Sequence, residues 1–214
     1  MTDEPLALDG RRVGRRGAQT RRRLLDATAA LLASRGVRDL RVVDIARSVG
    51  ASPATFYQYF ADVEAAVLVL AGDVAADAAP LVALLDEPWD LDAIGTARAL
   101  VDGFVDYWDA HRAVLRTRNL AAQEGDARFR EVRNRANAPL VEGFTRQMRM
   151  ARERGRGDPE MSPLAAAAAL VALLERMAAF HEDLEPLGIT RAELVDTTAR
   201  IIHQTVVGVR PAVN

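Results

Sequence analysis

The sequence contains no cysteine and no lysine, and aromatic residues make up only 5% of it. Without cysteine the chain cannot form a disulfide bond, a thiolate metal site or a cysteine nucleophile. No uninterrupted apolar run reaches about 18 residues, so we expect no membrane-spanning helix. Residues 1–23 are polar and rich in arginine, without the apolar segment of a secretory signal. We therefore expect a cytoplasmic protein that has no membrane partner.

The usual patterns of catalytic and metal sites are also missing. The three histidines, His111, His181 and His203, lack the H-x-x-x-H and E-x-x-H spacings that place two ligands on one helix face. There is no G-x-S-x-G motif and no glycine-rich phosphate loop. We expect no catalytic residue, no metal and no cofactor. A helical-bundle enzyme is the less favoured alternative.

The length and apolar content indicate a folded chain, and the absence of strand signals indicates its fold class. With 214 residues, of which 50% are hydrophobic, the chain can bury a core as one large domain or two small ones. No segment alternates apolar and polar residues with the period of a strand, and no Asn-Gly or Asp-Gly turn stands between two such segments. We therefore predict an all-α fold.

The net charge of −2 hides an asymmetry along the chain. Residues 1–60 hold 11 arginines against six acidic residues, a balance of +5, whereas the rest holds 17 arginines against 24 acidic residues, a balance of −7. A basic N-terminal quarter on an acidic body indicates that one end meets a polyanion. The alternative is a solvated basic tail.

Helical periodicity begins near residue 18. Residues 1–17 show no such pattern, and we expect them to form a flexible arginine-rich arm. The first helix repeats apolar residues at i, i+1, i+4, i+7 and i+8, and Gly36 is placed to end it. These positions are Leu24, Leu25, Thr28, Leu31 and Leu32.

Three more helices follow closely. A short one starts at Val42 and is ended by Gly50. The Ser52-Pro53 pair predicts the start of the next, because serine suits the N-cap and proline suits the first helical position. Asp62 is the expected N-cap of a fourth helix, over about 62–79. Beyond it, periodicity predicts one or two helices over 91–125 and single helices over about 126–155, 163–181 and 190–207, with a kink at Pro139.

Four of the 11 aromatic residues lie within five positions of the third helix: Phe56, Tyr57, Tyr59 and Phe60. Two short helices around a glycine turn predict a helix-turn-helix, whose second helix enters the DNA major groove. Its small first residues can approach bases, the phenylalanines can anchor it, the tyrosine hydroxyls can reach phosphates, and Gln58 can bond a base edge. The alternative is a core aromatic cluster, in which each buried hydroxyl would need a partner.

These residues resemble the DNA-binding region of the TetR family of bacterial transcriptional regulators. The resemblance covers about residues 18–70 and rests on L-L-A-x-x-G, D-I-A-x-x-x-G-x-S and T-x-Y-x-Y-F in combination. It implies a three-helix DNA-binding domain over 18–61 and a helical ligand-binding and dimerisation domain over 62–214. Such proteins are homodimers that repress transcription from double-stranded operator DNA until a small molecule binds and releases them. The fourth helix is expected to carry that motion.

The resemblance also implies the DNA contacts, with a recognition helix over about 53–59. The positions that it implies are Ser52, Ala54, Thr55, Tyr57, Gln58 and Tyr59, and Arg41 and Arg47 are two further expected contacts. Two positions depart from the family pattern. Arg41 stands where the family often has threonine, and Val63 stands where it commonly has a lysine that contacts phosphate. Arg41, Arg47 and the arginines of the arm are expected to compensate.

Apolar side chains of the C-terminal helices are candidates for a pocket that takes a small hydrophobic effector, such as an acyl or lipid-like molecule. These residues are Phe104, Tyr107, Trp108, His111, Phe144, Met148, Met177, Phe180 and His181. The alternative is an ordinary core, with both histidines merely partly exposed. The arginines over 128–156 indicate a solvated helix face, or else a site for an anionic ligand group such as a coenzyme A phosphate.

The last two helices have apolar faces that suit a homodimer interface. The candidate contacts are Leu170, Leu174, Leu194, Thr198, Ile201 and Ile202. Dimerisation also follows from the DNA interpretation, because a two-fold dimer reads the two halves of a palindrome. The alternative is that these faces are buried within one chain. A helical adaptor that never touches DNA is the third class of function, and it predicts no salt-dependent DNA affinity.

Overall fold

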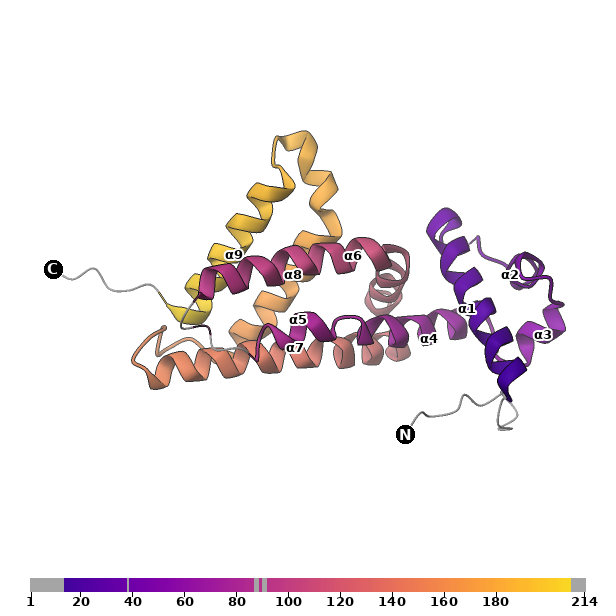
Figure 1. The fold of residues 1–214 in the computed structure, drawn as a ribbon, viewed down its shortest axis with the longest axis horizontal. Coiled ribbons are helices and arrows are strands. Elements are labelled where there is room, and N and C mark those ends of the chain that lie inside the picture. Colours follow the sequence, from indigo (N-terminus) through magenta and orange to yellow (C-terminus); the bar gives the residue numbers. More distant parts are fainter. Residues whose placement is uncertain (1–13, 38, 87–88, 90–91, 209–214) are drawn as a thin grey trace. The chain divides into compact units, whose positions relative to one another are not determined.

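The computed structural model describes residues 14–37, 39–86, 89 and 92–208, and every regular element among them is helical (Figure 1). The predicted all-α fold is thus confirmed. The chain forms two compact units, Met1–Val74 with Arg112–Arg133, and Ala75–His111 with Asn134–Asn214. The boundaries fall inside helices α4, α6 and α7, so each of these three helices contributes residues to both units.

Helix α1 (Arg15–Arg35) begins three residues before the predicted start. The last three residues of the expected arm are therefore helical, while residues 1–13 lie outside the described residues. Apolar periodicity does not detect this first turn because it is polar, although arginine and glutamine are good helix formers. Gly36 ends the helix as predicted, with a φ of 76° that favours glycine.

The core of the first unit joins α1 to the two short helices after it, α2 (Val42–Ser48) and α3 (Pro53–Tyr57). One face of α1 is buried, as the periodicity predicts, and its Thr28 hydroxyl donates to the Leu24 carbonyl at 2.7 Å. The other buried residues of these helices are Leu25, Leu32, Ile45, Ala46 and Phe56. Helix α2 packs against both α1 and α3, and all three helices contribute buried residues to this core.

Helix α4 (Val63–Ala76) begins where Asp62 caps it, with the Ala65 N–H donating to Asp62 Oδ1 at 2.7 Å. It ends sooner than predicted, because a separate short helix, α5 (Ala79–Ala83), follows. Pro80 lies in the first turn of α5, where its missing N–H leaves no helical bond unmade.

Two helical stretches, Val63–Ala83 and Pro163–Leu187, have the length and mean hydropathy of a membrane span. The search for uninterrupted apolar runs did not detect them, because acidic residues interrupt both stretches. A core helix of a water-soluble protein satisfies the same criteria. The two stretches therefore do not by themselves indicate a membrane protein.

The second unit contains the C-terminal helices. Helix α6 (Ala93–Gln123) is a single element, and α7 (Ala127–Glu153) continues through Pro139. Helices α8 (Pro163–Leu184) and α9 (Arg191–Val207) pack against each other as a hairpin joined by the 3-10 turn η1 (Glu185–Leu187) (Figure 1). The backbone of α8 leaves helical geometry at Phe180, with φ −126° and ψ 15°. The sequence predicted a kink at Pro139 but not this one.

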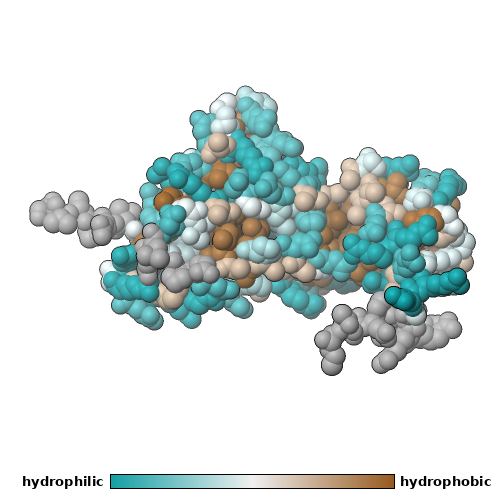
Figure 2. Space-filling view, viewed as in Figure 1, coloured by the Kyte–Doolittle hydropathy of each residue, from teal (hydrophilic) through white to brown (hydrophobic). Residues whose placement is uncertain are grey.

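Leu85, just after α5, packs closely against α7. A Cβ at Gly143 would lie 2.7 Å from Leu85 Cβ, so only glycine allows this approach. Gln147 donates from Nε2 to the Leu85 carbonyl at 2.7 Å, and Phe144 packs edge-on against Trp89 at a ring distance of 6.2 Å. On the face shown in Figure 2 the helix exteriors are mostly hydrophilic, and hydrophobic residues show mainly between helices.

Replacing Phe56 should unfold the first unit more easily, because its side chain is fully buried. We expect Phe56→Ala to lower the free energy of unfolding by about 3–5 kcal/mol, as loss of a buried aromatic ring does. Tyr57→Ala, at the neighbouring position, is the matched control, because Tyr57 is 52% exposed. It should change the free energy of unfolding by less than about 0.5 kcal/mol in a urea titration followed by circular dichroism. Equal losses for the two variants would contradict this assignment of the core.

Candidate nucleic-acid interface

The turn between α2 and α3 depends on one glycine. Gly50 has a φ of 67°, which other residues rarely adopt. The Gly50 N–H donates to the Arg47 carbonyl at 3.1 Å and the Ala51 N–H donates to the Ala46 carbonyl at 2.9 Å, which closes the end of α2. Arg23 of α1 donates from Nη2 to the Val49 carbonyl at 2.8 Å. The turn is therefore fixed both internally and to α1.

Helix α3 starts as the Ser52-Pro53 pair predicts. Ser52 is the N-cap, and its Oγ accepts the Thr55 N–H at 3.2 Å. The hydroxyls of these two residues also lie 3.0 Å apart, so their side chains bond to each other. Both were predicted to contact DNA, and the structure shows that the Ser52 hydroxyl is engaged within the helix.

The aromatic residues of this region divide into two groups, as the sequence predicts. Phe56 and Phe60 are buried with ring centroids 5.3 Å apart, and Arg21 of α1 lies over the Phe60 ring at 5.3 Å. Tyr57 is exposed and Tyr59 partly exposed. The helix is thus anchored by phenylalanines, and its tyrosine side chains reach the surface. A wholly buried aromatic cluster is not what the structure contains.

All eight predicted DNA-contacting residues lie in the first unit, and none is buried. Six are exposed, and Thr55 and Tyr59 are partly exposed. Arg41 is the N-cap of α2, and Arg47 lies in its last turn, 4.0 Å from Asp44. The N-terminal turn of α1 adds Arg15 and Arg16, both exposed, and contains no acidic residue. This surface combines accessible side chains with positive charge.

The predicted effector residues belong to the second unit, and most of them are buried in its core. Phe104, Trp108, Phe144 and Met148 are each no more than 5% exposed. Tyr107 lies between the rings of Phe104, at 5.7 Å, and His111, at 5.3 Å. The structure therefore brings the α6 residues together as a stripe.

Phe180 does not share this environment. It is exposed, and Arg176 of the same helix lies over its ring at 3.7 Å. Met177 is partly exposed. These two predicted effector residues therefore lie at or near the surface of α8.

The predicted dimer contacts lie mostly in the interior of the single chain, as the alternative of burial within one chain describes. Five of the six residues are buried within the single chain, and only Ile201, at 43%, is exposed. The buried five are Leu170, Leu174, Leu194, Thr198 and Ile202. Side chains already enclosed by their own chain have little surface left to bury against a second copy. Periodicity identified the apolar faces of α8 and α9 correctly but could not show that they pack on each other.

Sequence spacing also missed a cluster of possible metal ligands. Asp109 of α6 and His181 and Glu182 of α8 each offer a ligand atom, and these atoms lie within 4.8 Å of one another. His181 Nε2 lies 2.9 Å from Asp109 Oδ1, so the pair also makes an ordinary hydrogen bond. The ligands come from distant positions, which no local motif can detect. The cluster alone does not indicate a bound ion.

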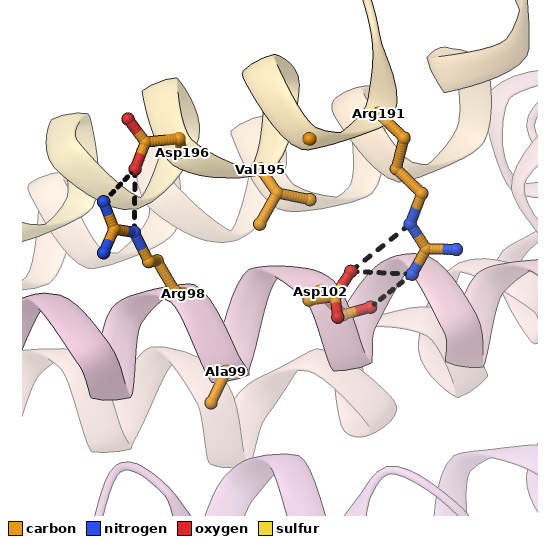
Figure 3. A pocket seen from close by; sticks show the side chains of 7 residues that line it. Arg98, Ala99, Asp102, Arg191, Val195 and Asp196 are labelled. Atoms are coloured by element: carbon orange, nitrogen blue, oxygen red, sulfur yellow. Dashed lines mark hydrogen bonds and ion pairs between the residues drawn. The ribbon is translucent and has the colours of Figure 1, made fainter.

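The second unit has an open groove of about 620 Å³ between α6 and α9 (Figure 3). A second of about 510 Å³ lies along α7 beside Leu164, and a third of about 10 Å³ includes Met148. Met148 is the one predicted effector residue that lines any of these three.

The large groove has charged walls and a small apolar floor. Figure 3 shows Arg98 paired with Asp196 on one side and Arg191 paired with Asp102 on the other. Hydrogen bonds to Asp106 and Asp102 raise the pKa of Arg191. Hydrogen bonds from Arg200 and Arg98 lower the pKa of Asp196. Because these charged side chains are already paired with one another, the groove is poorly suited to an ionic ligand.

Two family models match the chain. Residues 24–66 match the model described as bacterial regulatory proteins of the tetR family, and residues 83–213 match the tetracyclin repressor-like C-terminal domain. The second match alone covers more than half of the chain.

Individual relatives agree with the family models. The chain is 37% identical over 110 residues to the HTH-type transcriptional regulator EthR of Mycobacterium tuberculosis, a match that covers 50% of each protein. The chain thus spans about half the length of the curated relatives it matches.

Solved structures share the fold at low identity. GusR of Salmonella enterica superimposes with a TM-score of 0.67 at 16% identity, covering 88% of this chain and 96% of that one. FadR of Thermus thermophilus, solved with lauroyl-CoA, superimposes with a TM-score of 0.59 at 20% identity, covering 90% and 97%. Because its N-terminal region folds as an anchored helix-turn-helix and both family models match it, the chain belongs to the TetR family of bacterial transcriptional regulators.

Proposed function

We propose that the protein is a cytoplasmic repressor that binds a palindromic operator as a homodimer and leaves it when a small hydrophobic effector binds. The observation that supports this most is the surface of α3, whose small N-terminal residues are exposed while Phe56 and Phe60 hold it from behind. We keep the sequence-based division into a DNA-binding region over 18–61 and a ligand-binding and dimerisation region over 62–214.

Helix α3 is the proposed reader of bases. Ser52, Ala54 and Thr55 have side chains small enough for the helix end to enter a major groove about 12 Å wide. Gln58 is exposed and can bond a base edge, and the exposed hydroxyl of Tyr57 can reach a phosphate. Arg41 and Arg47 flank the helix and supply phosphate contacts that Val63, at the start of α4, cannot make.

A revised surface is proposed for the dimer. Helices α8 and α9 also carry exposed residues that are apolar or small. We call this set the outer α8–α9 face. It consists of Leu164, Ala168, Ala169, Ala172, Phe180 and Ile201. Small side chains allow two helices to approach closely, and a second copy would cover the exposed apolar atoms.

Helix α4 is the proposed transmitter of the effector signal. Within the first unit, Glu64 accepts from Arg128 of α7 at 3.0 Å, and Asp73 lies 3.7 Å from Arg22 of α1. Within the second unit, Asp77, just after α4, lies 3.3 Å from His111 of α6. His111 belongs to the predicted effector stripe, so a ligand that moves this side chain would change a contact at the end of α4.

The effector is proposed to be hydrophobic because the stripe on α6 and its neighbours on α7 are almost wholly apolar. One structural neighbour, the Thermus thermophilus FadR, was solved with lauroyl-CoA, which makes acyl thioesters reasonable first probes. To shift a two-state equilibrium, such a ligand must bind one state more tightly than the other.

The DNA proposal predicts that DNA affinity falls steeply as the salt concentration rises, and that Arg41 and Arg47 contribute to this dependence. A polarisation titration should use a duplex that the wild-type protein enriches from a randomised library. The double variant Arg41→Ala/Arg47→Ala should lower the slope of log K against log salt by about 0.9 per lost phosphate contact. Arg149→Ala, on the exposed side of α7, is the control and should leave the slope unchanged. A wild-type protein without salt-dependent affinity would favour the adaptor alternative.

The dimer proposal predicts that charges on the outer α8–α9 face separate the subunits. Ala172→Glu/Ile201→Glu should shift the mass measured by light scattering from about twice the 23.3 kDa chain to one chain. Burying an unpaired carboxylate in an interface is unfavourable, which is the reason for the expected change. Ala192→Glu, exposed on α9 but outside this face, should remain dimeric. A double variant that stays dimeric would contradict the proposed face.

The effector proposal predicts a fluorescence change at Trp108. In Trp89→Phe, Trp108 is the remaining tryptophan. Titration with lauroyl-CoA or dodecanoate should change its emission and, over the same concentrations, release the enriched duplex in a mobility shift. The Trp108→Phe variant, which keeps Trp89, is the comparison for the site. DNA release without any change at Trp108 would place the effector elsewhere.

A further inference from the structure

At the N-terminus of α3, the side-chain oxygen of Ser52 contacts two groups of Thr55. Ser52 Oγ accepts the Thr55 backbone N–H at 3.2 Å and lies 3.0 Å from Thr55 Oγ1. The first contact is an ordinary N-cap bond. The second is an additional bond between side chains, and it connects two residues that were both expected to contact DNA.

The hydrogen atoms available to this pair can be counted. Each hydroxyl has one hydrogen to donate and two lone pairs to accept with. Ser52 Oγ uses one lone pair for the Thr55 N–H, and the contact with Thr55 Oγ1 uses either the Ser52 hydrogen or the Thr55 hydrogen. In both cases the two hydroxyls retain one hydrogen for an outside acceptor. They therefore act as one unit.

The direction of the Thr55 side chain depends on this unit. Threonine in a helix divides between two χ1 rotamers, unlike valine or isoleucine, so its own backbone does not fix its hydroxyl. Hydrogen bonds to a base edge require heavy-atom distances near 2.8 Å and good alignment. Thr55 is partly exposed, and among the described contacts its hydroxyl bonds to Ser52. Fixing the rotamer before DNA arrives avoids the cost of ordering it on binding.

The length of α3 increases the importance of this arrangement. The helix has five residues, Pro53–Tyr57, too few to be stable in isolation. Pro53 fixes φ at the first position of the helix. The Ser52 side chain satisfies the backbone N–H of Thr55. The same oxygen that starts the helix therefore also orients its third side chain.

We propose that Ser52 is a positioning residue that orients the Thr55 hydroxyl for base reading, and that it does not itself contact a base. The inference rests on the proposed function, in which α3 reads DNA. Ser52 was predicted to contact DNA, and we now assign it the role of orienting Thr55, which makes the contact.

The chain provides a matched control for the cap alone. Helix α8 also starts with a Ser-Pro pair, and the Ala165 N–H donates to Ser162 Oγ at 3.4 Å. The residue at the position equivalent to Thr55 is alanine, which has no hydroxyl to orient. Ser162→Ala therefore removes a cap without removing a side-chain pair.

The test measures discrimination at each base pair separately. The probes are the duplex enriched by the wild-type protein from a randomised library and the set of its single base-pair substitutions. Thr55→Val, which keeps the shape but not the hydroxyl, should lose about tenfold discrimination at one base pair, equivalent to about 1.4 kcal/mol. Ser52→Ala should lose a similar factor at the same base pair. Ser162→Ala should lower the melting temperature by a comparable amount and leave every base preference unchanged.

A double variant distinguishes positioning from direct contact. If Ser52 acts through Thr55, Ser52→Ala/Thr55→Val should lose about tenfold at that base pair and not about 100-fold. Ser52→Thr, which keeps a hydroxyl, should restore discrimination to within about twofold of the wild type. Losses that multiply, or a Ser52→Ala loss at a different base pair, would overturn the inference.

The failure of this inference can be distinguished from the failure of the proposed function. If Thr55→Val loses discrimination and Ser52→Ala does not, α3 still reads DNA and Ser52 does not position Thr55. If no α3 variant alters any base preference, the reading of bases by α3 is wrong and the inference fails with it. A uniform loss at all base pairs in Ser52→Ala would show general damage to α3, and it would also overturn the specific role.

Discussion

The DNA-reading surface depends on the burial of two phenylalanine rings. A helix of five residues does not persist in water, because too few hydrogen bonds offset the loss of backbone freedom. Phe56 has no exposed surface and Phe60 has 2%, so α3 is held as part of the core of the first unit. Because burial fixes one side of the helix, the other side can consist of small and polar residues, as the proposed contact with DNA requires. The cap at Ser52 and the φ of Gly50 then set where the helix begins.

Helix α4 follows α3 in the chain and is linked to other helices by pairs of polar side chains. The acidic residues of α4 and the position after it each meet a basic residue type on a different helix: Glu64 with Arg128, Asp73 with Arg22, and Asp77 with His111. A hydrogen bond from Arg128 also lowers the pKa of Asp126 to about 2. The two arginine pairs are exposed and individually weak, so they can be exchanged at small cost. Weak, specific pairs are what the proposed role of α4 as transmitter requires, because a tightly packed contact would resist a change of position.

Local signals in the sequence predicted local structure well. Gly36, Gly50, Ser52-Pro53 and Asp62 mark helix ends through backbone geometry and capping, which depend on a few neighbouring residues. Relations between distant residues were not predictable in the same way. Periodicity predicted the apolar faces of α8 and α9 but not that they are buried against each other. It also could not predict that Asp109 lies next to His181, which is 72 positions away in the sequence. The break at Phe180 has no proline or glycine to mark it.

The packed state of the predicted effector stripe has a consequence for regulation. Phe104, Trp108 and Phe144 have at most 3% of their surface exposed, and none of them lines the three cavities described above. An effector that enters among these side chains must separate them, and it must replace the contacts that they lose. It therefore binds a rearranged core better than the packed one. That difference in affinity is what a ligand needs in order to shift a conformational equilibrium, since a ligand that fits both states equally shifts nothing. A closed core is thus compatible with an effector site, provided that the open core is the state with low affinity for DNA.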